Sequence, residues 1–242
     1  FRFNVLHKPF DNPKVRQAVL YAFNQEDFLK ATVGSEEYYK VCKGLFICGT
    51  PFGTEVGFEA MLESNFKKAR ELLTEAKYDG TPVVLMHSTD NQSLTNLAPV
   101  AKSLMERAGF KVDMQSMDWQ TLVARRAKKD PPSAGGWNAF MTSWVAADVM
   151  NPISTAYVNA ACDKASFGWP CDEKLEKLRA DFAKEIEPAK QKAIAEAVQQ
   201  RVIEYTPEIP VGEWVSPNAM RKNVKGYLTS PVPVLWNVEI TK

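Results

Sequence analysis

The chain has 242 residues, and its 30 Lys and Arg against 29 Asp and Glu give a formal net charge of +1. This length can bury a core as one large or two small domains. The even charge argues against a dedicated nucleic-acid or anionic-membrane surface, and no apolar run approaches the roughly 18 residues of a membrane span.

The chain starts with FRFNVLHKPF, which predicts a short strand and has neither the apolar region nor the cleavage pattern of a signal peptide. An apolar start without an initiator Met suggests a piece of a longer protein. The start signal Asp11-Asn12-Pro13 then predicts a helix whose apolar face holds Val15, Ala18, Val19 and Ala22.

Further helices are predicted where apolar residues repeat on one face between start and stop signals. In chain order they cover 64–77, capped by Ser64, then 97–108, closed by Gly109, and 119–129, capped by Asp118. Two longer helices follow at 171–186, with Ile186 on the buried face, and at 188–205, which begins with Pro188. We expect these last two to support the domain rather than a site.

Three segments between the helices have strand patterns, namely TPVVLM (81–86), FKVDMQSM (110–117) and NAFMTSW (138–144). The resulting βαβαβ order predicts an α/β fold with a parallel sheet, right-handed crossovers and helices on both faces. Ligands of such open sheets bind beyond the carboxyl ends of the strands. Residues that directly follow these strands are therefore the candidates for a binding site.

Two segments meet that condition. The polar loop HSTDNQS (87–93) contains His87, Thr89 and Asn91, and the stretch MTSWVAADVMNP (141–152) contains Trp144 and Asp148. The Asp148 carboxylate stands where an apolar run stops, so it could meet a ligand, or it could cap the turn before Asn151-Pro152. The Trp144 ring could pack in the core or line a cleft, where aromatic side chains cover ligand surface.

The four cysteines fall into two close pairs, Cys42 with Cys48 and Cys162 with Cys171. Neither pair is a CxxC and the chain has only two histidines, so we expect no metal site and no cofactor. Two short-loop disulfides in an oxidising compartment are the prediction, and four reduced thiols in a cytosolic protein are the alternative. Trp169, in FGWPC, is expected to pack over the second pair or to touch ligand.

Catalytic motifs are absent from the sequence, which has no GxSxG, HExxH, Walker loop or GxGxxG. We therefore predict that the protein is not an enzyme. A thiol enzyme built on Cys42 is the remaining catalytic alternative, and it requires an accessible thiolate with a neighbouring base.

The stretch FNVLHKPFDNPKVRQAVLYAFNQEDFL (3–29) resembles the signature of the family 5 extracellular solute-binding proteins of ABC importers, the peptide and nickel type. Three further features follow in the family's order: the helix at 64–77, a Trp with an acid-bearing turn and Asn-Pro at 144–152, and NVKGY at 223–227. The resemblance spans the chain but covers only the second half of such proteins.

The resemblance implies a two-lobed receptor that closes on a solute by hinge motion. This chain would be its carboxyl-side lobe, of the periplasmic-binding-protein type II, with a central mixed, mostly parallel sheet flanked by helices. The implied parts are a hinge or crossover strand at 1–6, the ligand-binding lobe at 7–208, a return hinge strand at 209–214, and a tail at 215–242 that packs on the first lobe.

The resemblance also implies a site, in which Asp148 pairs with the α-amino group of a peptide. The other implied ligand-binding residues are Trp144, Val145, Ala146, Asn91, Thr89, His87 and Trp169. Two features depart from the dipeptide-binding members, because Asp148 lies four rather than three residues after Trp144 and the loop 87–93 lacks an Arg. A longer peptide, or a cationic or neutral small solute, therefore remains open.

The implied function is solute capture for an ABC importer, with delivery of a peptide or similar solute to the permease membrane subunits. The receptor would be a monomer without nucleic-acid partners, located in the periplasm or anchored outside the cytoplasm as a lipoprotein. The alternative is a ligand-sensing domain fused to a transcription regulator, in which the cysteines would be reduced.

Overall fold

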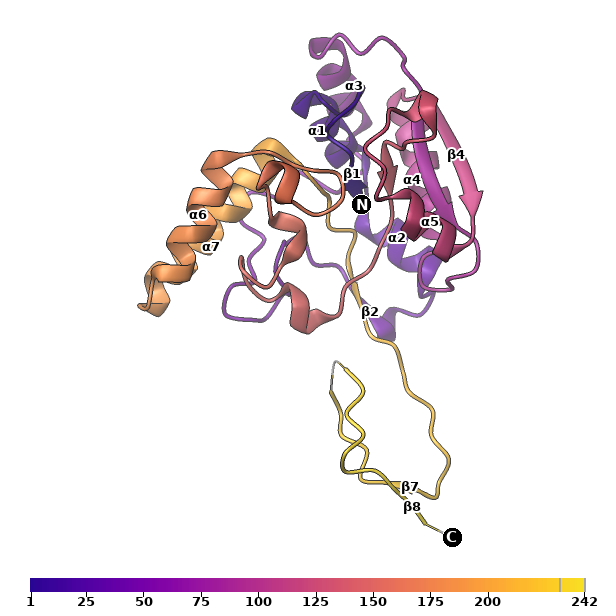
Figure 1. Cartoon of the computed structure of the whole chain (residues 1–242), viewed down its shortest axis with the longest axis vertical. Helices are drawn as coiled ribbons and strands as arrows, with labels where there is room; N and C mark the ends of the chain where they lie inside the picture. The colour runs from indigo at the N-terminus through magenta and orange to yellow at the C-terminus, as the bar shows by residue number, and fades with distance from the viewer. Residues whose placement is uncertain (231, 242) are drawn as a thin grey trace.

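The computed structural model describes residues 1–230 and 232–241. These residues form a body of helices and strands, and a tail that extends away from one edge of the body (Figure 1). The body contains the large hydrophobic core, which joins the amino-terminal helices to one face of the central sheet.

The central sheet has four strands in the order β1-β5-β3-β4. Their bounds are Arg2–Phe3 for β1, Val83–Ser88 for β3, Val112–Met117 for β4 and Ala139–Phe140 for β5. Strand β3 runs parallel to β4 and to β5, whereas β1 is antiparallel to β5. The structure thus confirms an α/β fold with a mixed, mostly parallel sheet flanked by helices.

Seven α-helices complete the described body. They are α1 (Pro13–Ala22), α2 (Gln25–Thr32), α3 (Phe66–Glu75), α4 (Leu97–Ala108), α5 (Trp119–Arg125), α6 (Glu173–Lys184) and α7 (Pro188–Tyr205). The predicted side-chain caps on α5 and α6 are confirmed, because Asp118 accepts from the Thr121 amide and Asp172 from the Leu175 amide. Helix α2 has its own Asn24 cap and was not among the predicted elements.

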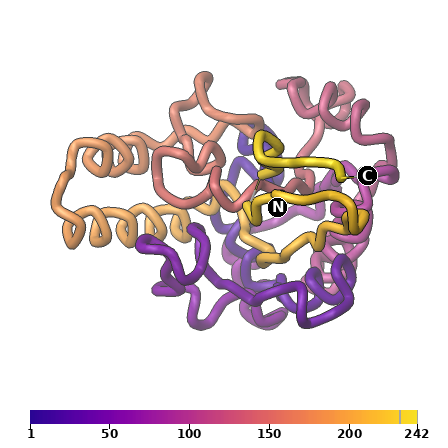
Figure 2. The backbone as a smooth tube through the Cα atoms, turned by 90° about the horizontal axis from the view of Figure 1, so that it is seen from below, coloured from indigo at the N-terminus to yellow at the C-terminus, as the bar shows by residue number. Residues whose placement is uncertain are grey.

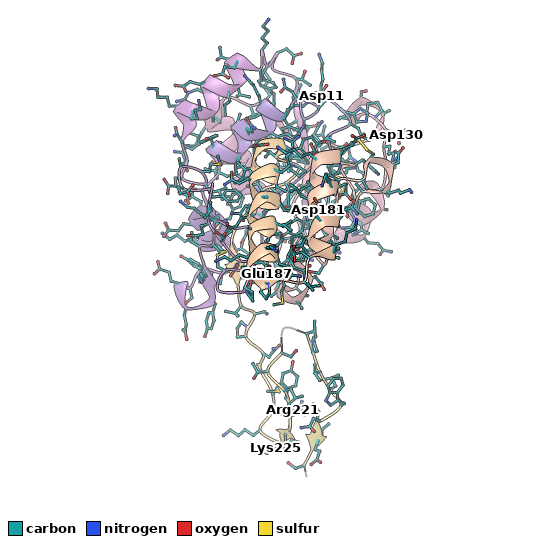
Figure 3. The ribbon with its side chains drawn as sticks, turned by 90° about the vertical axis from the view of Figure 1, so that its left-hand side faces the viewer. Asp11, Asp130, Asp181, Glu187, Arg221 and Lys225 are labelled. Atoms are coloured by element: carbon teal, nitrogen blue, oxygen red, sulfur yellow. A yellow bond between two sulfur atoms is a disulfide. The ribbon has the colours of Figure 1, made fainter. Side chains whose placement is uncertain are left out.

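The two faces of the sheet carry different cores, as the alternation along β3 requires. Val83 and Leu85 belong to the large core, which includes residues of α1, α3 and α4. Met86 points to the opposite face, where it joins Phe140, Trp137 and Leu122 of α5 in a smaller aromatic core. Helices α6 and α7 pack side by side as a hairpin that projects beyond the sheet (Figures 1 and 3).

Three details of the predicted helices are wrong. Asn65, rather than Ser64, caps α3 by accepting from the Lys68 amide at 3.0 Å, while Ser64 has a left-handed φ of 59°. The helix predicted at 119–129 ends at Arg125, whose guanidinium donates to the Gly135 and Gly136 carbonyls. Ile186 is 92% exposed, because it lies in the turn that joins α6 to α7 at the tip of their hairpin.

The last predicted strand is much shorter than the expected 138–144, since only Ala139–Phe140 pairs with neighbouring strands. Its outer neighbour β1 has only two residues, which lie opposite Phe140 and Ala139, and β3 pairs with the same two residues of β5. Residues 209–214 likewise contain only β6 (Glu213–Trp214), which pairs with β2 (Tyr39–Lys40).

Both predicted disulfides are confirmed. Cys42 is joined to Cys48 with their Cα atoms 5.9 Å apart, and Cys162 to Cys171 with theirs 4.1 Å apart. No cysteine is free within the described residues. The first bridge closes a loop held by buried Gln25, whose side-chain oxygen accepts from the Cys42 amide at 2.9 Å.

The tail beyond β6 forms a small antiparallel pair, β7 (Val224–Lys225) with β8 (Glu239–Ile240). Figure 3 places Arg221 and Lys225 well below the body, and the view in Figure 2 shows the tail crossing in front of it. The tail exposes several large apolar side chains: Val215, Met220, Leu228, Val232, Leu235, Trp236 and Ile240. Among the helices that the structure describes, none is long and apolar enough to cross a membrane.

Candidate functional site

The two candidate segments leave the sheet at the same edge. Strand β3 pairs in parallel with β5, with Leu85 opposite Ala139 and Met86 opposite Phe140, so their carboxyl ends point the same way. In Figure 1 the arrow of β4, which runs parallel to β3, points toward the lower side of the body, from which the chain also departs toward the tail. The geometry expected from the βαβαβ order is therefore present.

Asp148 lies on a short 3₁₀ turn, η3 (Ala146–Val149), with an exposed side chain. Its amide donates to the Val145 carbonyl at 2.9 Å, and its carboxylate has no hydrogen-bond or ionic partner within the described residues. The neighbouring Asn151 performs the local capping, because its side-chain oxygen accepts from the Ile153 and Ser154 amides. The carboxylate of Asp148 thus remains available to a ligand.

Trp144 stands at the start of this turn and is 47% exposed. Its ring lies 6.0 Å from the ring of Tyr157, whose hydroxyl donates to the Leu45 carbonyl at 2.7 Å. Burial raises the pKa of Tyr157 well above its ordinary value, so this phenol stays protonated and keeps the hydrogen bond. The Trp144 ring is therefore partly exposed and is supported by the ring of Tyr157. The neighbouring Val145 is exposed and Ala146 is half-buried.

The segment after β3 is fixed by bonds to the next strand. Thr89 donates through both its amide and its hydroxyl to the Met117 carbonyl, at 3.0 and 3.2 Å. Asn91 opens a turn in which its carbonyl accepts from the Leu94 amide and the Thr95 hydroxyl. Asp90 accepts from the Trp119 amide at 2.7 Å, which anchors the start of α5.

Two predicted site residues are buried in this conformation. His87 belongs to β3 rather than to a loop, and its ring nitrogens contact the Ser116 hydroxyl and the Thr95 carbonyl. Trp169 is 6% exposed and packs 6.1 Å from the Trp137 ring in the smaller core. The rings of both residues thus contact other parts of the body in this conformation.

Two surface hollows lie away from this edge. An open hollow of about 500 Å³ is lined by residues of α4 and β4, including Lys102, Arg107 and Met114. A second, of about 250 Å³, lies between α3 and the end of α4. The edge that carries Asp148 and Trp144 is an open face, as expected when one side of a cleft is supplied by another part of a protein.

The alternatives based on free thiols have no support here. The sulfur atoms of Cys42 and Cys48 lie with a Glu213 carboxylate oxygen within 4.8 Å of one another, which would suit a metal ion only if the sulfurs were thiolates. They are joined in a disulfide. A Cys42 nucleophile is likewise excluded in this form, and two disulfides fit an extracytoplasmic location.

The family description "Bacterial extracellular solute-binding proteins, family 5 Middle" matches residues 1–167. The chain belongs to this family. The family is one of binding proteins, and the resemblance seen in the stretch 3–29 is confirmed.

Relatives of this family 5 chain carry peptide-related names. The Probable peptide ABC transporter periplasmic-binding protein y4tO of Sinorhizobium fredii is 30% identical over 98% of this chain and 45% of its own length. Di/tripeptide-binding protein 2 of Pseudomonas aeruginosa is 25% identical over 95% of this chain and 42% of its own length. The chain thus spans about half the length of these relatives.

The fold agrees with solved structures of the same type. The Escherichia coli murein tripeptide binding protein MppA superposes with a TM-score of 0.82 over all of this chain and 47% of its own, at 19% identity. At that identity the likeness supports the fold alone, which is the mixed α/β fold described above.

Proposed function

We propose that this chain is the carboxyl-side, ligand-binding lobe of a receptor that captures peptides for an ABC importer. The observation that carries the proposal is the unpartnered Asp148 carboxylate beside the exposed Trp144, at the carboxyl edge of a family 5 sheet. A regulator domain is the weaker candidate, because both cysteine pairs are oxidised.

The proposed hinge consists of the segments 1–6 and 209–214, which lie together. The Phe1 nitrogen donates to the Ile209 carbonyl at 2.8 Å, and the Ile209 amide donates to the Phe1 carbonyl at 2.9 Å. We assign residues 7–208 to the lobe and the tail 215–242 to packing on the opposite lobe, which would cover its exposed apolar side chains.

In the proposed complex, Asp148 accepts hydrogen bonds from the α-amino group of the peptide. An ammonium ion that leaves water needs an anionic partner that only accepts, and the exclusion of water on closure strengthens the pair. Trp144, Val145 and Ala146 would contact the adjacent side chain, while Thr89 and Asn91 would face the peptide backbone. His87 and Trp169 would hold this surface in place.

The proposed partners are the permease membrane subunits and the opposite lobe, with no nucleic acid and no cofactor, and the receptor acts as a monomer. Its proposed location is the periplasm or the outer face of the cytoplasmic membrane as a lipoprotein. The two disulfides support an oxidising compartment.

The test is calorimetric titration of dialanine and trialanine into a full-length receptor that contains this chain. Asp148→Asn keeps the shape but removes the charge, so we expect affinity to fall tenfold or more. The matched control is Asp181→Asn on α6, where Asp181 pairs with Lys177 away from the edge (Figure 3). Equal affinities of the two variants would contradict the role of Asp148.

A further inference from the structure

Arg2 and Glu208 face each other across the two proposed hinge segments. They form an antiparallel bridge, flanked by the bonds between Phe1 and Ile209. Side chains that are directly opposite in an antiparallel pair lie on the same face, with Cβ atoms about 4.5 to 5.5 Å apart. A cation and an anion therefore share one face of a narrow two-stranded ribbon.

The Arg2 guanidinium connects this ribbon to the candidate site. Its Nε donates to the Phe167 carbonyl at 2.7 Å and its Nη1 to the Tyr157 carbonyl at 2.5 Å. Tyr157 is the residue whose ring supports Trp144. A movement of Arg2 would thus be transmitted to the surface that holds Trp144 and Asp148.

One polar atom of each hinge residue is buried without a hydrogen-bond partner among the described residues. These atoms are Arg2 Nη2 and Glu208 Oε1, and no ion pair joins the two side chains in this conformation. Leaving a buried donor or acceptor unpaired costs about 1 to 3 kcal/mol, and more for a charged group. A conformation that brings these atoms together would therefore be favoured.

We propose that Arg2 and Glu208 form a hinge charge pair that makes direct contact when the lobes close, so that ionisation of Glu208 favours the closed, ligand-holding receptor. Closure of a two-lobed protein changes the twist of its crossover strands, which is the movement that can join the two side chains. The inference rests on the proposed receptor function, because it assumes a second lobe.

The surroundings of Glu208 place its titration in the physiological range. Burial raises the pKa of Glu208 to about 7, against the opposing effect of Arg2. Burial also lowers the pKa of Arg2 to about 10. Tyr157 and Tyr205 face Arg2 as neutral phenols, and Glu213 lies near Tyr157.

The sign of the pH effect follows from these values. Contact with Arg2 lowers the pKa of Glu208 in the closed state relative to about 7 in the present conformation. Closure then releases a proton, so ligand affinity rises as the pH increases toward and through 7. Each unit of pKa difference between the two states changes affinity about tenfold.

The experiment compares the dissociation constants of dialanine and trialanine at pH 5.5 and pH 8 in the full-length receptor. We expect about tenfold tighter binding at pH 8 in the parent and less than twofold in Glu208→Gln, which is similar in shape but does not ionise. The control Glu204→Gln removes an exposed carboxylate that pairs with Arg201 on α7, and it should keep the parent's pH dependence. The same pH dependence in all three proteins would overturn the proposal.

A second readout separates failure of this inference from failure of the peptide function. If neither peptide binds at either pH, the peptide function is contradicted, and X-ray scattering of the ligand-free receptor then decides the hinge question. We expect the radius of gyration to decrease from pH 5.5 to pH 8 in the parent and to stay constant in Glu208→Gln. A radius that does not change with pH in the parent would overturn the hinge proposal.

Discussion

At the scale of single residues, a few buried polar side chains hold distant segments together. Arg16 is 1% exposed, and its guanidinium donates to the carbonyls of Phe10, Tyr205 and Thr206. It thereby ties α1 to the end of α7, where Thr206 has a left-handed φ of 49° and ends the helix. The apolar pattern of α1 gave no indication of this role, because Arg16 falls between buried apolar positions.

Replacing Arg16 should therefore lower the free energy of unfolding far more than replacing an exposed arginine. Arg16→Met leaves at least three carbonyls without their donor, so we expect the free energy of unfolding to fall by about 3 kcal/mol or more. Urea unfolding followed by circular dichroism measures this change. Arg221→Met in the tail, where the side chain is exposed, should change it by less than about 0.5 kcal/mol, and equal losses would contradict the assignment.

The stability of this chain should also depend on the ionisation of Glu208. Its folded pKa of about 7 lies above the ordinary value of 4.5, so its contribution is greatest below pH 4.5 and is lost as the pH rises through 7. Glu208→Gln should therefore raise the melting temperature at pH 8 relative to the parent and leave it nearly unchanged at pH 4.5. A gain that is the same at both pH values would contradict the assigned burial.

At the scale of elements, the sequence predicts those helices that combine apolar periodicity with capping residues. The helices at 13–22, 97–108, 173–184 and 188–205 agree closely with the predicted segments, because each combines an apolar face with start or stop residues. The short pieces β1, β2, β5 and β6 exist through pairing with distant segments. A two-residue strand has no periodicity, so these were missed or overextended.

The candidate site could likewise be predicted in part from the sequence, while the rest depends on contacts between distant segments. The order of strands and loops predicts that the segments 87–93 and 141–152 leave the sheet at the same edge, and the parallel pairing of β3 with β5 agrees with this. The burial of His87 was not predictable, since it depends on the Ser116 hydroxyl and the Thr95 carbonyl, which the fold brings together from other segments. Asn151 could have been recognised as the local cap, because it precedes Pro152.

Close packing between β1 and the 167–168 segment gives a prediction at this scale. Gly168 has a φ of 100°, and a Cβ atom there would lie 2.0 Å from the Phe3 carbonyl oxygen. Gly168→Ala should therefore displace β1 and lower the free energy of unfolding by about 3 kcal/mol or more. Denaturant unfolding measures this loss.

The matched control is Gly49→Ala. Gly49 also has a positive φ, 87°, but nothing lies within 4 Å of the added Cβ atom. This variant should lose only the roughly 1 kcal/mol that the backbone conformation costs a residue with a side chain. A loss at Gly168 no larger than that at Gly49 would show that β1 can move without penalty.

At the scale of the whole molecule, the tail and the body are separate in their packing. Strands β7 and β8 pair with each other, and Trp236 is 86% exposed. Deleting residues 217–242 from this chain should therefore change the free energy of unfolding of the body by less than about 0.5 kcal/mol. The deletion should also reduce binding of a hydrophobic dye, and a large loss of stability would show that the tail packs on the body.

The exposure of the candidate site determines how tightly this chain alone is expected to bind a ligand. Asp148 and Trp144 lie on an open face, and a receptor that encloses its ligand between two lobes needs the opposite surface as well. Peptide affinity should thus be weak in this chain alone and much stronger in a full-length receptor.

The most direct test of the central claim is denaturing mass spectrometry of small molecules released from the full-length receptor, purified from a secreting host. We expect peptides to be recovered from the parent protein and from Asp181→Asn, and to be absent or strongly depleted in Asp148→Asn. Recovery of the same non-peptide solute from all three proteins would contradict both the peptide function and the role of Asp148.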